Sequence, residues 1–150
     1  MKPKSPYFKN FAKRMMASLQ KTQSDVAQPA QTLKSPAVEI QNLALSVRQP
    51  YAEQIMRGTK VIEYRSVPTH IRGRVYIYSS STPGHFSLFQ KMKAEPDDFP
   101  LRALVGTVEI VDCKGKDKDY EWTLARPMRL VKPIKPDNNP QPIWFHPFKE

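Results

Sequence analysis

The stretch "LSVRQPYAEQIMRGTKVIEYRS", residues 45–66, lies at the start of the predicted folded domain and contains many charged residues. The alternating pattern at 43–47 predicts a strand, and a helix is expected to follow at Pro50–Arg57, because proline leaves no unpaired N–H in a first helical turn. Gly58 is a natural helix stop. Residues 59–66 then predict a second strand, whose charged side chains either are solvated or line a binding site.

The rest of the chain predicts a mostly β (α+β) protein. Further elements are expected as strands at 73–81 and 103–115, one or two strands within 120–136, a short helix or loop at 85–94, and a closing aromatic segment at 142–148. Gly106, inside a predicted strand, indicates a bulge or a close approach of another group. Five to seven short strands with one or two helices favour a small, mostly antiparallel β-barrel.

The composition points to one domain with an anionic partner. The chain has 150 residues, a net charge of +10 and a pI near 9.8, which favours nucleic acid, a nucleotide or an anionic membrane surface. Residues 1–41 are predicted to be a basic, disordered tail, with a short basic helix at Tyr7–Leu19, and residues 42–150 to be the domain. The tail is either a solvating leader or an arm for phosphate contacts.

Other classes of site have little support in the sequence. No apolar run reaches the roughly eighteen residues of a membrane span, and the N-terminus lacks a secretory pattern. Cys113 is the only cysteine, so we expect a reducing, cytoplasmic setting. Three separated histidines give no metal spacing, and we find no phosphate loop or catalytic triad. We therefore expect a monomer with no metal and no cofactor.

The spacing of eight residues in the opening stretch is more specific than its composition. These residues are Leu45, Ser46, Gln49, Pro50, Gly58, Lys60, Glu63 and Arg65. They resemble the signature of the ASCH (activating-signal-cointegrator homology) domain, a branch of the PUA-like superfamily. The resemblance extends over residues 43–148 and includes "RGRVYIYSS", "LVGTVEIVDC" and the pair Ile143–Trp144. It implies a PUA-like barrel with a helix beside its mouth, and association with RNA or other nucleic acid.

The charged strand offers a candidate ligand site. Alternation places Glu63 and Arg65 on one face, and Lys60 can bend over that face from the turn after the helix. Lysine and arginine suit phosphate, and a carboxylate suits the exocyclic amine of cytosine or guanine. A single-stranded nucleic acid, or a modified nucleoside, would use all three groups. The alternative is that Glu63 and Arg65 form a salt bridge that closes the barrel mouth.

Further candidates flank this strand. Ser46, Arg48 and Gln49 precede the predicted helix, where free N–H groups can receive phosphate, although helix capping explains Ser46 and Gln49 equally well. Arg72 and Arg74 are expected as phosphate contacts or as part of a solvated turn. Four aromatic residues are candidate base-stacking platforms or packing groups: Tyr64, Tyr76, Tyr78 and Trp122.

A hydrolase is the second functional hypothesis. One branch of the wider family is an acetylcytidine amidohydrolase, and the resemblance carries its catalytic lysine to Lys60 and its glutamate to Glu109. The threonine of that set is Glu63 here, which removes a hydroxyl and adds a carboxylate that would keep the lysine charged. RNA phosphodiesters are the other substrate considered. The alternative role for Glu109 is an ion pair with Lys60 or Arg74. A third hypothesis is an adaptor whose tail recruits a protein.

Overall fold

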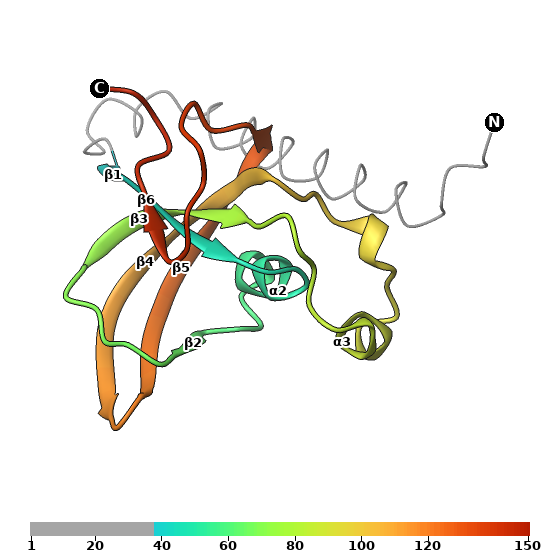
Figure 1. Ribbon diagram of the computed structural model, residues 1–150, viewed down its shortest axis with the longest axis horizontal. Coiled ribbons are helices and arrows are strands. Elements are labelled where there is room, and N and C mark those ends of the chain that lie inside the picture. The colour runs from blue at the N-terminus through green and yellow to red at the C-terminus, as the bar shows by residue number, and fades with distance from the viewer. Residues whose placement is uncertain (1–37) are drawn as a thin grey trace, which may run out of the picture.

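The computed structural model describes residues 38–150, so residues 1–37 of the predicted tail, with its helix at Tyr7–Leu19, lie outside the described residues. Residues 38–41 of that tail are described, and the first strand already begins at Ile40. Within that range the chain forms one six-stranded sheet in the order β2-β5-β4-β3-β1-β6 (Figure 1). The strands are β1 (Ile40–Val47), β2 (Ile62–Arg65), β3 (Gly73–Ser79), β4 (Ala103–Lys116), β5 (Asp119–Ile134) and β6 (Trp144–Phe145). All neighbouring pairs are antiparallel except β1 and β3, which are parallel. The mostly β prediction is therefore confirmed.

The sheet curls until its distant strands meet. Trp122 of β5 stacks on Trp144 of β6 with ring centroids 5.8 Å apart, although three strands separate β5 from β6 in the sheet. Arg65, on the edge strand β2, donates from Nη2 to the carbonyl oxygen of Ser46 in β1 at 2.8 Å. These contacts give the sheet the barrel-like curvature that the sequence predicted. The buried interior includes Leu45, Ile77 and Trp122.

The predicted helix beside the barrel is α2 (Tyr51–Arg57). It packs Ala52, Ile55 and Met56 into the core and ends at Gly58, which has φ 75°. A positive φ is accessible to glycine at little cost, so the local sequence decides where this helix stops. The remaining helices are α3 (Phe86–Lys91) and the 3-10 turn η1 (Pro96–Asp98). No helix within residues 38–150 has the length and apolar character needed to cross a bilayer.

The strand predicted at 59–66 is shorter than expected. The backbone N–H groups of Thr59 and Lys60 both donate to the carbonyl oxygen of Gln54, at 3.0 and 3.1 Å. These bonds hold both residues against the end of α2, so β2 begins only at Ile62. Lys60 thus lies in the connection between the helix and the strand.

Gly106 occupies a position where another backbone comes close. A Cβ added there would lie 2.2 Å from Met56 Sδ and 2.5 Å from the carbonyl oxygen of Met128. The pairing of β4 with β5 also shifts register between Leu104 and Gly106. Both the bulge and the close approach predicted from the sequence are present.

Candidate functional site

An open cleft of about 740 Å³ lies at one end of the sheet. Because β1 and β3 are parallel neighbours, with Val47 beside Ser79, both strands end at this edge and their following loops meet there. β2 and the first residue of α2 form the opposite wall. The lining residues are Ser46, Val47, Arg48, Tyr51, Glu63, Tyr64, Arg65, Tyr78, Ser80, Ser81, Thr82, Arg102, Pro140, Gln141 and Pro142.

Glu63 is the one carboxylate among residues 38–150 that lines this cleft. Its side chain is only 9% exposed, and its Oε1 lies 3.5 Å from Arg65 Nε. Its Oε2 is buried and has no hydrogen-bond partner within the described part of the chain. Burial raises the pKa of Glu63 above its ordinary value of 4.5, against the opposing attraction of Arg65 and Lys60. The cleft therefore contains a carboxylate that still has capacity to accept hydrogen bonds.

Arg65 was expected either to contact a ligand or to form a salt bridge that closes the barrel mouth, and its position allows both. It forms the ion pair with Glu63 and fastens β2 to β1 through Ser46, as a residue closing the barrel mouth would do. Its guanidinium also lies 5.8 Å from the ring centroid of Trp122. It nevertheless lines the cleft. The salt bridge and the exposure of a cation to a ligand are therefore compatible.

Lys60 lies next to the cleft wall. Its Nζ donates to the carbonyl oxygen of Ile62 at 2.7 Å. The same ammonium lies 5.1 Å from the ring centroid of Tyr51 and 5.3 Å from that of Tyr64. Both tyrosines line the cleft, so Lys60 holds them by cation–π contacts and adds positive charge near Glu63.

The rim of the cleft across from β2 contains the ring of Tyr78 and two arginines. Tyr78 packs edge-on against Phe145 at 5.2 Å, and burial raises the pKa of its hydroxyl although nearby Arg102 opposes that shift. Arg48 and Arg102 are exposed on the rim. Other lining residues carry no motif that marks them in the sequence: Tyr51, Arg102, Gln141 and residues 80–82. The run "SSST" at 79–82, directly after a strand, was the available signal for the last of these.

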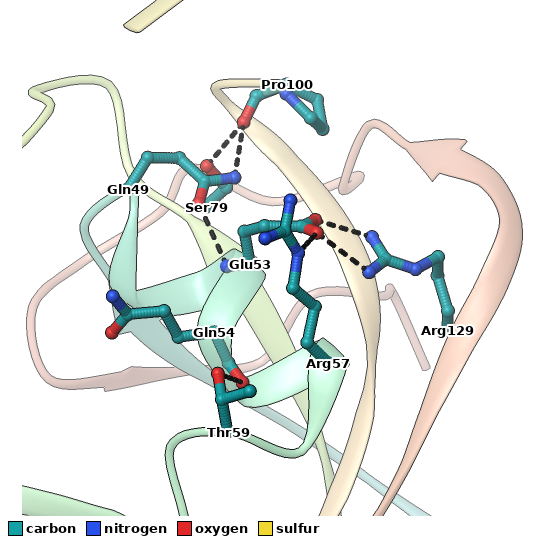
Figure 2. Close-up of polar contacts among 8 residues, drawn as sticks. All are labelled: Gln49, Glu53, Gln54, Arg57, Thr59, Ser79, Pro100 and Arg129. Atoms are coloured by element: carbon teal, nitrogen blue, oxygen red, sulfur yellow. Dashed lines mark hydrogen bonds and ion pairs between the residues drawn. The ribbon is translucent and has the colours of Figure 1, made fainter. Parts of the chain in front are cut away.

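Ser46 and Gln49 differ in what they can offer a ligand. Ser46 lines the cleft, but its Oγ donates to the carbonyl oxygen of Gln141 and its N–H to that of Ile143. Gln49 is 1% exposed, and its Oε1 accepts from the N–H of Glu53 at 3.0 Å (Figure 2). Its Nε2 donates to Pro100 at 3.1 Å. The bond from the Glu53 N–H satisfies a donor in the first turn of α2, so the contact of Gln49 agrees with helix capping, the alternative left open for it.

Two expected phosphate contacts lie outside the cleft. Arg74 is 6% exposed, which is incompatible with the solvated turn considered for it. Its Nη1 donates to Thr107 Oγ1 at 2.9 Å, because β3 begins at Gly73 and faces Arg74 toward β4. Arg72 is exposed, but its Nη1 donates to the carbonyl oxygens of Thr69 and Ile71.

The four candidate stacking rings separate into two groups. Tyr64 and Tyr78 line the cleft, and Tyr64 is 60% exposed. Trp122 is fully buried against Trp144, and Tyr76 packs edge-on against Phe148 at 5.4 Å. The rings outside the cleft therefore serve packing.

Glu109 belongs to a different charge cluster from Lys60. It accepts from Arg126, and its Oε1 lies 3.4 Å from Arg74 Nη2. Arg126 first, and then Arg74, hold the pKa of Glu109 below its ordinary range. No ion pair joins Lys60 to Glu109 within the described part of the chain. The structure thus shows no direct contact between the two residues on which the hydrolase hypothesis depends.

The described residues do not form a recognisable metal-binding site. Among residues 38–150, no three His, Cys, Asp or Glu side chains are grouped so that they could hold an ion.

A curled, mostly antiparallel sheet with a helix beside its open end defines a PUA-like domain, the class associated with RNA binding. Within that class, the chain belongs to the ASCH domain family, whose sequence model matches residues 45–138.

Relatives support this assignment at two levels. Activating signal cointegrator 1 from Homo sapiens is 36% identical over 125 residues, and its Mus musculus counterpart is 27% identical over 125 residues. Each alignment covers 67% of this chain but only 21% of the relative, so the chain spans about a fifth of those proteins. The crystal structure of ASCH from Zymomonas mobilis has a TM-score of 0.50 and 13% identity, covering 69% of this chain and 85% of that one. That similarity shows the fold alone.

Proposed function

We propose that the protein binds single-stranded nucleic acid, RNA in particular, in the cleft between β2 and the ends of β1 and β3. The observation that carries the proposal is the convergence of three arginines and three tyrosines on one opening. The arginines are Arg48, Arg65 and Arg102, and the tyrosines are Tyr51, Tyr64 and Tyr78.

The charges suit a phosphodiester chain. Arg48 and Arg102 are exposed at the rim, where a guanidinium can contact a phosphate without breaking an internal ion pair. Arg65 remains within the cleft, and the only opposing charge among the lining residues is Glu63. The net potential therefore favours an anionic ligand.

The rings and the size of the opening suit a base. Bases stack on aromatic side chains with little sequence preference, and Tyr64 presents a largely exposed ring. Small-molecule sites usually measure about 300–1,000 Å³, so a cleft of 740 Å³ has room for a nucleotide. Of the residues expected from the sequence, we assign Ser46, Arg48, Glu63, Arg65 and Tyr78 to this site, with Lys60 supporting its wall.

The experiment is a salt titration of the full chain with fluorescein-labelled single-stranded RNA, followed by anisotropy. The variant Arg48→Gln, Arg102→Gln removes two rim cations. A matched control, Lys132→Gln, Lys135→Gln, removes two exposed cations outside the cleft lining. For single strands the slope of log affinity against log salt changes by about 0.7 for each lost phosphate contact.

We therefore expect the rim variant to bind more weakly, with a slope shallower by about 1.4. The control should retain the slope of the unmodified chain. The proposal fails if both variants lose the same slope, because the binding would then reflect overall charge rather than the cleft.

A further inference from the structure

The carboxylate of Glu63 has a position that phosphate binding alone does not explain. Glu63 as a residue is 7% exposed, and the other charged residues that line its cleft are arginines. Its Oε2 has no partner among residues 38–150. A buried acceptor without a donor is unfavourable, and native proteins contain few of them. The terminal torsion of a glutamate side chain is broad, so this carboxylate can reorient when a donor enters the cleft. We therefore expect the ligand to supply the hydrogen-bond donor that Glu63 Oε2 lacks.

The surrounding charges restrict what that ligand can be. Arg48, Arg65 and Arg102 line the same cleft, and Lys60 lies close enough to act on Glu63. A lysine or arginine side chain from a protein partner would supply a donor but would meet this positive charge. A nucleotide supplies neutral N–H donors for Glu63 and a phosphate for the arginines. Charge complementarity thus favours a nucleotide over a basic peptide.

The four RNA bases differ in how many adjacent hydrogen-bond donors they can offer to a carboxylate. An ionised glutamate only accepts, and its two oxygens can accept side by side. Guanine places the N1–H and the 2-amino group next to each other, which matches this pattern. Adenine and cytosine place one amine beside a ring nitrogen that accepts, and uracil places its one N–H between two carbonyls. Guanine is therefore the only standard RNA base that offers two adjacent donors.

We propose that the cleft selects guanine, with Glu63 accepting from the guanine N1–H and 2-amino groups while the rim arginines hold the adjacent phosphate. This inference rests on the proposed function, since it names the base that the nucleic-acid site prefers.

The test uses the full chain and labelled five-nucleotide RNAs that carry uridine at four positions. The central position is guanosine, inosine, adenosine, cytidine or uridine. A bidentate contact discriminates against a wrong base by roughly tenfold or more. We expect guanosine to bind about tenfold more tightly than uridine, adenosine or cytidine. Inosine, which lacks only the 2-amino group, should fall between guanosine and uridine.

Two variants separate Glu63 from a general loss of charge. Glu63→Gln keeps the shape of the side chain but places an amide donor against the donors of guanine, so the preference should disappear. Glu109→Gln makes the same chemical change outside the cleft and should leave the preference intact. Thermal melting of both variants checks that they fold. If Glu63→Gln does not fold, the comparison of bases on the unmodified chain still decides.

The outcomes distinguish this inference from the proposed function. Equal, salt-sensitive binding of all five RNAs overturns guanine selection and leaves nucleic-acid binding in place. A guanosine preference that survives Glu63→Gln overturns the role of Glu63. Binding of none of the RNAs overturns both proposals, and binding of a labelled hexalysine peptide in their place would assign the cleft to a basic protein partner.

Discussion

Removal of the Glu53 carboxylate should destabilise the fold far more than its position on a helix suggests. Glu53 is 2% exposed and accepts from two arginines, with Arg57 Nε at 2.5 Å and Arg129 Nη1 at 2.7 Å (Figure 2). Arg129 lies on β5, so this cluster fastens α2 to the sheet. The variant Glu53→Ala leaves both guanidinium groups without this acceptor.

The loss of unfolding free energy depends on how well water can solvate the two arginines once the Glu53 carboxylate is gone. Breaking a buried ion pair from one side costs about 3–5 kcal/mol. The Arg57 side chain is 28% exposed and can be solvated again, whereas that of Arg129 is only 16% exposed. We therefore expect the lower end, about 3 kcal/mol of unfolding free energy, against a typical total of about 5–15 kcal/mol.

Urea unfolding followed by the fluorescence of Trp122 and Trp144 measures this loss. With a slope near 2 kcal/mol/M, the midpoint should fall by about 1.5 M. The control is Lys114→Ala, which removes an exposed ion pair with Glu121 at 3.7 Å and should cost about 0–1 kcal/mol. The double variant Glu53→Ala, Arg129→Ala should cost less than the sum of its single changes. Equal midpoints for Glu53→Ala and Lys114→Ala would refute the reasoning.

Two further predictions concern packing and pH. Gly106→Ala should lower the unfolding free energy by about 1–3 kcal/mol in the same urea assay, because its Cβ would lie 2.5 Å from a backbone oxygen that cannot move aside easily; an unchanged midpoint would contradict the close approach. The raised pKa of Glu63 means that its stabilising, neutral form is fully present below pH 4.5 and is lost as pH rises through the folded-state pKa. The stability of the unmodified chain relative to Glu63→Gln should therefore fall as the pH rises above 4.5, and a difference that is constant or rises with pH would count against this assignment.

Local chemistry made part of this protein predictable. The end of α2 at Gly58 follows from the freedom of glycine to adopt positive φ, and the interruption at Gly106 follows from the absence of a side chain. The family signature at residues 45–66 also predicted the curled sheet and its flanking helix. These features depend on residues close together in the chain or on a pattern of fixed spacing.

The partners of the charged residues were not predictable in the same way. Arg74 and Glu109, both taken as candidate site residues, pair with each other across β3 and β4. The sequence offered Arg74 and Lys60 as alternative ion-pair partners of Glu109 and did not decide between them. Glu53 pairs with Arg129, 76 positions away, and nothing in the local sequence distinguishes it from a solvated helix glutamate. Arg102 reaches the cleft through a loop whose path no periodicity indicates.

The sequence by itself therefore determined the family, most of the strands and the main helix, because backbone preferences and side-chain periodicity act over a few residues. Only the tertiary structure decided which charges share the cleft. The parallel pairing of β1 with β3 and the curvature that brings β2 against β1 set those distances. Such long-range contacts place Glu63 in the cleft and pair Glu109 with arginines outside it, although both are glutamates on predicted strands.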